Sequence, residues 1–520
     1  MRLEIDMSLL TLRSKYLNLI PILLGLIIRL INIKMPIVGV HSWRQADTAA
    51  MARHFALGNT PIWFPQIDWG GATQGYVESE FPIYPYIVGQ IYKLFGLNEI
   101  FGRLTSIIFG LLTIFLIIRI TTILFNYRAG FWAGIFYSLM PLSVYYSRTF
   151  QAESLLIFLA SLSLERLLIY IKKPNLLSLF VCWIGFTLAC LIKVLPLFWL
   201  GLPLLFIITH KTSFVGSSQL NISLRRIFNG LISKGSIMFI SLTLICLVSW
   251  YSYAYYLGLS TGNSFGFWGG SSDRSSIQLV FQFQIWIDLF IRIVIRNLSL
   301  FGLPFLIFGL FRNRHSLARN LLLSGLLGVL FSTIFSMRSS SVHEYYQLPM
   351  QLYVCPLMGY GMTNIKNFSS VFIVRKYLSK ILLTLITIVS LIVLNFDYFA
   401  IERDQIKIWM PLANEIRKAL PINGKLVSIT GNDPTLLNLA RRQGWLISLD
   451  EINESNIKNW SKNGAYYLVG SLDWSEFYTP LDNQISKKKL DKYLCNSDTP
   501  YSCSILLNNT YIIPISKLSK

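Results

Sequence analysis

Apolar stretches of about 20 residues recur along this chain, and they limit its fold more than any other feature. Each stretch is long enough to cross a hydrocarbon layer of roughly 30 Å. Only 14% of the 520 residues are charged, against roughly 25% in soluble domains, and the mean hydropathy is +0.52. These values exclude a single water-soluble core. Because the stretches are many, they also exclude a soluble protein with one signal peptide or anchor.

The net charge of +21 is spread along the chain rather than concentrated. The basic residues lie in short segments between the apolar stretches, where they set the orientation of a membrane protein. A lesser effect is their attraction to anionic lipid headgroups. We therefore expect membrane lipids, and no nucleic acid, as partners.

The order of apolar and basic segments predicts the topology. If the N-terminus is cytoplasmic, alternate connecting segments are also cytoplasmic, and these are the ones richer in Lys and Arg. We predict about 11–13 transmembrane helices and a large extracytoplasmic first loop at 35–96. The predicted spans are Tyr16–Ile33, 101–125, 129–147, 151–171, 175–191, 194–210, 234–256, 285–311, 318–336, 345–365 and 381–397. The basic residues assigned to the cytoplasm include Arg128, Lys172, Lys173, Lys211, Arg225, Arg226, Lys234, Arg312, Arg314, Arg319, Lys366, Arg375, Lys376 and Lys380.

The character of the sequence changes after about residue 397. Short β-rich runs at Lys425–Thr430 and Ala465–Val469 flank a helical pattern at Pro434–Gln443 that would end at Gly444. We therefore predict an all-α polytopic membrane domain at 1–397, followed by a small extracytoplasmic α/β domain at 398–520. If that domain faces an oxidising compartment, Cys495 and Cys503 could pair.

The first loop contains the most informative motif. A helix is predicted from Ser42, which can cap it, to Gly58, which can terminate it, and its Ala-rich middle favours a helix at the membrane surface. On it Trp43 and Asp47 share a face, with Arg44 beside them. A carboxylate held there by Arg and Trp could act on a lipid headgroup. An amphipathic surface helix with a solvated Asp–Arg pair explains the same pattern.

Two further acids lie at the ends of predicted spans. Glu80 stands just before Pro82 at a membrane entry, where acids are ordinary. Glu153 opens an apolar helix, and an acid at a helix N-terminus is favourable by itself. The functional alternative is that Glu153 forms a second carboxylate facing Asp47 across an outer cavity.

Cations complete the candidate set. Lys193 interrupts an apolar run, and a charge at such depth is costly and usually functional. Arg292 belongs to a charged stripe with Asp288 and Arg296 at i, i+4 spacing. His343 lies at an outer junction between a loop and a helix.

These segments, in this order, resemble the polyprenyl-phosphate-dependent glycosyltransferases of the GT-C class. The nearest group is family 39, which includes protein O-mannosyltransferases and the aminoarabinose transferase of lipid A. The resemblance covers roughly residues 10–365 and rests on Arg44-Gln-Ala-Asp47, Glu80-Phe-Pro-Ile-Tyr84, Lys93-Leu-Phe-Gly96, Ser147-Arg-Thr-Phe-Gln-Ala-Glu153, Leu191-Ile-Lys193 and His343-Glu-Tyr-Tyr-Gln-Leu-Pro349.

The resemblance implies a sugar donor linked through phosphate to a long isoprenoid, and chemistry on the extracytoplasmic face. A glycosyl transfer needs a carboxylate base near the acceptor, and the departing lipid phosphate needs donors and cations. The base would be Asp47 or Glu153, with Glu80 as a supporting acid. The phosphate contacts would come from Arg44, Lys193, Arg292, His343 and Tyr345.

The sequence also departs from the family pattern. His41 and Ser42 stand where the family begins its motif with an Asp-Glu pair, so Asp47 matches a second acidic position. Phe81 replaces a lysine, Ile83 replaces the second proline, and Glu153 replaces an aspartate. Either Asp47 has taken the role of base, with His41 assisting, or the chemistry is altered. No cofactor is required, although Asp47, Glu80 and His41 are candidate ligands for a divalent metal ion.

The sequence therefore predicts an inverting glycosyltransferase of the bacterial plasma membrane, acting on an extracytoplasmic lipid, glycan or protein by single displacement. A transporter or flippase of lipid-linked saccharides would use the same cavity and cations without making a bond. A polymerase or ligase of lipid-linked glycans would differ chiefly in the size of its donor.

Overall fold

The computed structural model describes residues 18–210, 233–266, 277–312, 316–365, 372–471, 474–476, 479–480, 505–506 and 510–518. The chain divides into two compact units, which we treat separately. The membrane unit comprises Met1–Ile33, Arg103–Tyr253 and Gly269–Asp397, and the α/β unit comprises Lys34–Gly102, Ala254–Trp268 and Tyr398–Lys520. The predictions for Lys211, Arg225, Arg226, Arg314, Lys366, Cys495 and Cys503 fall outside the described residues.

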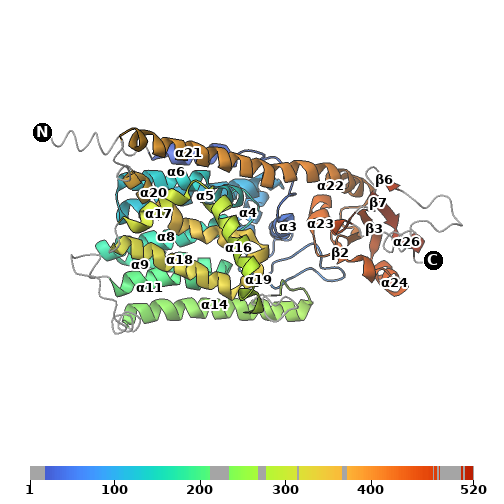
Figure 1. The fold of residues 1–520 in the computed structure, drawn as a ribbon. Coiled ribbons are helices and arrows are strands. Elements are labelled where there is room, and N and C mark those ends of the chain that lie inside the picture. Colours follow the sequence, from blue (N-terminus) through green and yellow to red (C-terminus); the bar gives the residue numbers. More distant parts are fainter. Residues whose placement is uncertain are drawn as a thin grey trace. The chain divides into compact units, whose positions relative to one another are not determined.

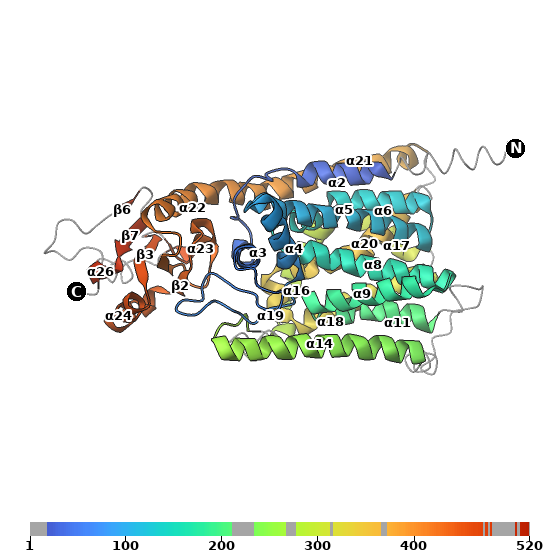
Figure 2. The same ribbon diagram turned by 180° about the vertical axis from the view of Figure 1, so that it is seen from behind.

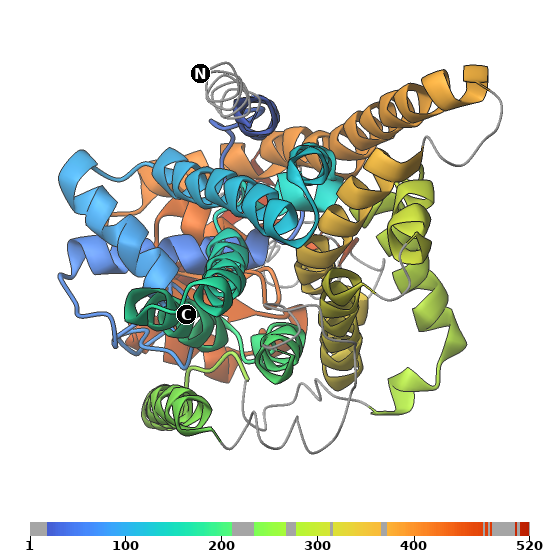
Figure 3. The same cartoon turned by 90° about the vertical axis from the view of Figure 1, so that its left-hand side faces the viewer.

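The membrane unit is built of helices, many of which run in roughly the same direction (Figures 1 and 3). In chain order they are α2 (Leu19–Arg29), α5 (Glu99–Leu124), α6 (Tyr127–Leu139), α7 (Pro141–Tyr146), α8 (Glu153–Lys172), α9 (Leu176–Ile192), α10 (Pro196–Trp199), α11 (Gly201–Thr209), α14 (Lys234–Thr261), α15 (Ile277–Val280), α16 (Phe283–Arg292), the π-helix η1 (Ile293–Asn297), α17 (Leu303–Phe311), α18 (Leu317–Phe335), α19 (Met337–Val342), the 3-10 helix η2 (Glu344–Met350), α20 (Gln351–Asn364), α21 (Phe372–Val393) and the π-helix η4 (Leu394–Phe399).

Within the described residues, five helical segments are long and apolar enough to cross a membrane: Glu99–Leu124, Glu153–Lys172, Lys234–Thr261, Leu317–Phe335 and Tyr377–Ala419. Helix α14 leaves large apolar side chains exposed, among them Met238, Ile245 and Val248. Exposed apolar surface on this scale marks a contact with another apolar phase, here the lipid. The chain is a multi-pass membrane protein.

Several predicted spans are helical but interrupted. The span at 129–147 is divided into α6 and α7 at Pro141, because proline cannot continue the hydrogen-bond ladder of the preceding turn. The span at 285–311 consists of α16, η1 and α17, and Ser299 and Leu300 take left-handed backbone conformations between η1 and α17. Non-helical backbone at membrane depth is tolerated where it is buried in protein.

Glycines let α17 and α20 approach closely. A Cβ atom on Gly361 would lie 1.9 Å from the carbonyl oxygen of Phe305, and one on Gly309 would lie 2.0 Å from the carbonyl oxygen of Leu357. Small residues at such crossings allow backbone contact between membrane helices. The α17–α20 pair therefore depends on these two glycines.

The α/β unit combines the first loop with the C-terminal part of the chain. The loop supplies α3 (Ser42–Leu57) and α4 (Ile83–Phe95), which pack on each other. The C-terminal part contains α22 (Ala400–Ala419), β1 (Lys425–Ile429), α23 (Thr435–Ala440), β2 (Gly444–Ile447), η5 (Leu449–Glu451), α24 (Glu454–Lys462), β3 (Ala465–Ser471), β4 (Trp474–Glu476), β5 (Thr479–Pro480), β6 (Ile505–Leu506), β7 (Thr510–Pro514) and α26 (Ile515–Leu518).

A five-stranded sheet in the order β2-β1-β3-β7-β6 forms the core of this C-terminal part. Strands β2, β1 and β3 are parallel, whereas β7 runs antiparallel to both β3 and β6. Successive residues of a strand point to opposite faces, so Leu426 packs beneath α22 and α23, while Val427 packs beneath α24 and α26. The result is a sheet covered by helices on both faces (Figure 2), which confirms the predicted α/β fold.

The structure corrects one sequence-based boundary. Helix α23 ends at Ala440 rather than continuing to Gly444, because Arg441 turns the backbone into the left-handed region with φ of 54°. Gly444 instead begins β2. A Cβ atom there would lie 1.7 Å from the carbonyl oxygen of Leu426 on β1, so the glycine permits close approach of two strands.

Candidate active site

Helix α3 places Asp47 in the interior of the α/β unit. The helix begins at Ser42 and ends at Leu57, as its sequence predicts, and its small residues Ala46, Ala49 and Ala50 are buried with Asp47. Asp47 is only 6% exposed. Its Oδ1 accepts a hydrogen bond of 2.9 Å from the indole Nε1 of Trp69. The carboxyl is therefore buried and oriented rather than solvated, which favours the functional interpretation of this helix over the surface-helix alternative.

Burial raises the pKa of Asp47 to about 8. The hydrogen bond from Trp69 lowers that pKa, the negative charges of Asp68 and Asp433 raise it further, and Arg44 lowers it. Removal from water disfavours the charged form of a carboxyl. A carboxyl with a pKa near neutrality suits proton transfer at physiological pH.

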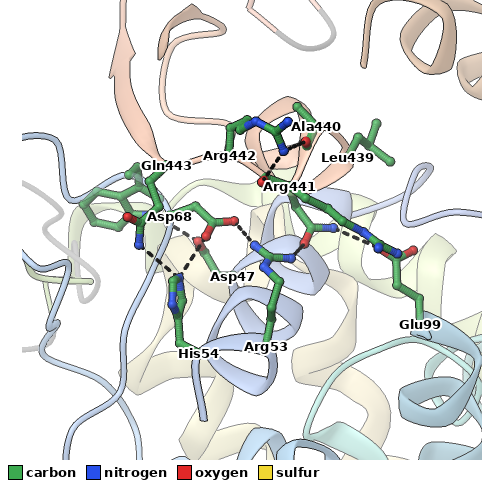
Figure 4. Close-up of polar contacts among 12 residues, drawn as sticks. Asp47, Arg53, His54, Asp68, Glu99, Leu439, Ala440, Arg441, Arg442 and Gln443 are labelled. Atoms are coloured by element: carbon green, nitrogen blue, oxygen red, sulfur yellow. Dashed lines mark hydrogen bonds and ion pairs between the residues drawn. The ribbon is translucent and has the colours of Figure 1, made fainter. Parts of the chain in front are cut away.

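A second buried carboxyl, Asp68, lies in the same region (Figure 4), and its pKa is shifted in the opposite direction from that of Asp47. Arg53 forms an ion pair with Asp68, and the Nε2 atom of His54 lies 3.0 Å from Asp68 Oδ1. Burial acts to raise the pKa of Asp68, but the charge of Arg53 and the hydrogen bonds from His54 and Arg53 hold it below its usual value. Asp68 is thus a fixed anion beside a protonatable Asp47.

The guanidinium of Arg53 also connects the first loop to the C-terminal helix α23. Its Nη1 donates a hydrogen bond of 2.9 Å to Oδ1 of Asn438, and the side-chain amide of Asn438 donates one of 3.3 Å to Glu99 Oε1. The hydroxyls of Ser42 and Thr435 are 3.0 Å apart. These bonds join α3 to α23 at both ends of α3.

The remaining first-loop candidates are not arranged as the sequence suggests. Arg44 pairs with Glu80 at 2.5 Å, so the expected Asp47–Arg44 pair is replaced by contacts with more distant parts of the chain. Trp69, and not Trp43, donates to Asp47. The ring of His41 packs edge-on against Trp43.

The side chains predicted as metal ligands do not form a ligand cluster in the described residues. Across the described ranges, no group of three His, Cys, Asp or Glu side chains is placed to hold a metal ion. Asp47, Glu80 and His41 therefore do not fit a metal site in this arrangement, and we assign no step to one. The involvement of a metal stays an untested prediction.

In the membrane unit, Glu153 and Lys193 form a buried ion pair. Glu153 is the first residue of α8, Lys193 directly follows α9, and Lys193 Nζ is 2.8 Å from Glu153 Oε1. The same ammonium group lies 4.4 Å from the ring centroid of Tyr345 and 4.9 Å from that of Tyr346. A desolvated ammonium is stabilised by aromatic faces as well as by its counter-ion. The favourable position of an acid at a helix N-terminus therefore does not account for the ion pair of Glu153 with Lys193.

His343, Tyr345 and Arg292 lie in the same unit, whereas Arg44, also predicted to contact the phosphate, lies in the α/β unit. The imidazole of His343 stacks on Tyr345, with ring centroids 5.4 Å apart. Arg292 donates to the carbonyl oxygens of Ser340 and Ser341 at 3.3 and 2.9 Å. Lys193, Tyr345 and His343 thus form one connected group. Whether Asp47 and Glu153 face each other stays a prediction, since they belong to different units.

Three residues near Asp47 were missed from the sequence. Trp69 and Asp68 occur in a loop without periodicity, where only the pair of glycines at 70 and 71 indicates an unusual backbone. Asp433 directly precedes the predicted helix at Pro434–Gln443. It is buried, its Oδ1 accepts a hydrogen bond of 2.8 Å from the Thr435 amide, and burial raises its pKa to about 7.

Comparison with known proteins shows what this chain is similar to. Residues 79–222 match the family described as dolichyl-phosphate-mannose-protein mannosyltransferase. A search of curated proteins found no match. The predicted resemblance to polyprenyl-phosphate-dependent GT-C glycosyltransferases is confirmed.

Solved structures share the fold over nearly the whole chain. ArnT from Cupriavidus metallidurans bound to undecaprenyl phosphate superimposes with a TM-score of 0.62 and 14% identity, covering 96% of this chain and 97% of ArnT. The archaeal oligosaccharyltransferase AglB from Archaeoglobus fulgidus, in complex with an inhibitory peptide and a dolichol-phosphate, has a TM-score of 0.54 and 12% identity, covering 88% and 70%. At such identities the likeness establishes a common fold. The particular reaction of this chain is argued from its own residues below.

Proposed function

We propose that this protein transfers a sugar from a polyprenyl-phosphate carrier to an acceptor hydroxyl outside the cytoplasm. The observation that carries this proposal is the buried, oriented carboxyl of Asp47, whose pKa is raised to about 8. It occurs in a chain with the fold of ArnT, whose structure contains undecaprenyl phosphate. A base of this kind is what a hydroxyl nucleophile requires.

The reaction is a single displacement with inversion. The Asp47 carboxylate takes the proton of the acceptor hydroxyl, and the acceptor oxygen forms a bond to the anomeric carbon of the sugar. The bond from that carbon to the phosphate oxygen breaks, and its electron pair leaves with the polyprenyl phosphate. Within the membrane unit, the group of Lys193, His343 and Tyr345 is the one suited to a phosphate, because the buried ammonium of Lys193 stabilises developing negative charge.

A transporter of lipid-linked saccharides is not favoured. It would need no titratable base, and the family match and the shared fold support a transferase. The location in a bacterial plasma membrane, with both the first loop and the C-terminal domain outside, belongs to the same proposal. The orientation is supported by the distribution of Lys and Arg along the chain.

The test is an incubation of the purified protein with undecaprenyl-phosphate-linked hexoses and pentoses and a membrane extract. We expect release of undecaprenyl phosphate together with a labelled acceptor. Asp47→Asn should reduce the release at least a hundredfold, the lower range for loss of a general base, which is roughly 10²–10⁴. A matched control is Glu415→Gln, an acid of the same unit that pairs at the surface with Lys418.

Full activity of Asp47→Asn would reject the assignment of the base. Movement of an intact lipid-linked sugar across vesicles, without release of undecaprenyl phosphate, would favour the transporter instead.

A further inference from the structure

The loop around Trp69 is attached to the edge of the C-terminal sheet. The amide of Gly444, the first residue of β2, donates a hydrogen bond of 2.9 Å to the carbonyl of Asp68. The carbonyl of the same glycine accepts one of 2.8 Å from the amide of Gly71. Both bonds go to one residue of β2 and enclose Trp69, so this segment is held at a fixed position along the strand.

The attachment is reinforced on both sides of Gly71. Its backbone takes a positive φ of 58°, and a Cβ atom added there would lie 2.5 Å from the indole nitrogen of Trp445 on β2. Lys425 at the start of β1 donates a hydrogen bond of 2.9 Å to the carbonyl oxygen of Gly71. Another residue at this position would have to displace the indole of Trp445 and adopt a strained backbone conformation.

Trp69 transmits this placement to Asp47. Its indole packs against the apolar cluster beneath α22 and α23 and meets the ring of Phe265 edge-on at 5.9 Å. The indole nitrogen then donates the hydrogen bond of 2.9 Å to Asp47 Oδ1. A bond to a buried carboxylate is sensitive to small displacements, because its strength falls steeply as distance and angle depart from their optimum.

We propose that the C-terminal domain is a positioning element of the active site, holding residues 68–71 on β2 so that Trp69 orients the Asp47 carboxyl and sets its readiness to accept a proton. Trp69 is then a positioning residue. The inference rests on the proposed function, because it gives meaning to Asp47 as the base.

The direction of the effect follows from the groups around Asp47. Asp68 and Asp433 disfavour its ionised form, whereas the Trp69 N–H and the more distant Arg44 favour it. Loss of the indole N–H removes a contact that favours the anion more than the protonated form. The pKa of Asp47 should therefore rise when Trp69 is replaced or displaced.

The experiment is an infrared titration of the full-length protein in lipid nanodiscs, between about pH 5 and about pH 10. The C=O band of protonated Asp47 is obtained by subtracting the spectrum of Asp47→Asn. In Trp69→Phe we expect the midpoint to move upward by roughly one to two units, the equivalent of one charge-assisted hydrogen bond. Gly71→Ala should move it in the same direction, because the added Cβ meets Trp445 and disturbs the attachment of the loop to the C-terminal domain.

Matched controls separate this effect from general damage. Trp63→Phe removes an indole from the same loop at an exposed position. Gly464→Ala places a Cβ at a similarly positive φ of 83°, but with nothing within 4 Å. Both should leave the midpoint unchanged. If Gly71→Ala does not fold, Lys425→Met provides a milder disturbance of the same attachment and should produce a smaller upward shift.

An unchanged midpoint in Trp69→Phe would overturn the proposal. So would a shift in Trp69→Phe with none in either Gly71→Ala or Lys425→Met, because the C-terminal domain would then have no part in it. Failure of the proposed function is distinguishable, since Asp47→Asn would then retain sugar transfer whatever the infrared titrations show.

Discussion

At the scale of single residues, Asp47 and Asp68 show how position decides the chemistry of a side chain. Both are buried in the α/β unit, yet Asp68 has Arg53 and His54 beside it, while Asp47 has one indole N–H. The pKa of Asp68 is lowered, and that of Asp47 is raised. Of these two carboxyls, only Asp47 can exchange a proton near neutral pH.

This difference predicts a pH dependence. Because the pKa of Asp47 is about 8, only about one tenth of the protein carries the ionised base at pH 7. We expect kcat/KM for release of undecaprenyl phosphate to rise about tenfold per pH unit below pH 8 and to level off above it. A profile that is flat between about pH 6 and about pH 9 would contradict Asp47 as the base.

The raised pKa of Asp47 also makes the free energy of unfolding depend on pH. A carboxyl whose pKa is raised on folding stabilises the folded state fully below its ordinary value of 3.8, and this contribution is lost as the pH rises towards about 8. The apparent Tm of the wild type should therefore fall relative to that of Asp47→Asn across this range.

The buried pair of Glu153 and Lys193 gives a second prediction at this scale. Lys193→Met leaves a buried carboxylate without its ammonium partner, which should cost about 3–5 kcal/mol. Adding Glu153→Gln removes that charge and should restore part of the apparent Tm in detergent. If Lys193 also contacts the donor phosphate, the double variant regains stability without regaining transfer. Equal stability of the single and double variants would show that the pair is not coupled.

At the scale of elements, the α17–α20 crossing depends on backbone contact at Gly361. A methyl group there would meet the carbonyl oxygen of Phe305. We expect Gly361→Ala to separate the helices and to cost about 1–3 kcal/mol, measured as a lower apparent Tm. Gly235→Ala on α14 has nothing within 4 Å of its new Cβ atom and serves as the control. A Tm in Gly361→Ala equal to that in Gly235→Ala would refute this account.

Elements with a strong local pattern could be predicted from the sequence. The extent of α3 agrees with the prediction, although its N-cap is His41 and the Ser42 hydroxyl contacts Thr435 instead of capping the helix. Strands β1 and β3 lie where β-rich runs occur. The end of α23 could not be predicted, because a glycine such as Gly444 is equally compatible with a helix terminus and with a closely packed strand.

The environment of Asp47 was predictable only in part. Its place on α3 follows from helical periodicity, but its partner Trp69 lies 22 residues further along in an irregular loop. Arg44 likewise pairs with Glu80, which is 36 residues away. Contacts of this kind are decided by tertiary packing and leave no periodic trace in the sequence.

At the scale of the whole molecule, the predicted topology places the first loop and the C-terminal domain outside and the basic segments inside. In a variant with Cys495 and Cys503 changed to Ser, we expect Tyr466→Cys, an exposed position on β3, to react with an impermeant maleimide in intact cells. Lys172→Cys at the end of α8 should react only after permeabilisation. Reaction of Lys172→Cys in intact cells would reverse the orientation.

The α/β unit is assembled from stretches that are far apart in the sequence, at 34–102, 254–268 and 398–520. The first of them leaves the ribosome well before the last, and at about 5–20 residues per second the roughly 300 intervening residues take on the order of a minute or less. During that time the segment around Trp69 has no β2 to bind. The nascent chain therefore cannot acquire an oriented Asp47 carboxyl until β2 has been synthesised. If Asp47 is the base, a chain truncated before residue 444 should release no undecaprenyl phosphate even when its membrane helices insert.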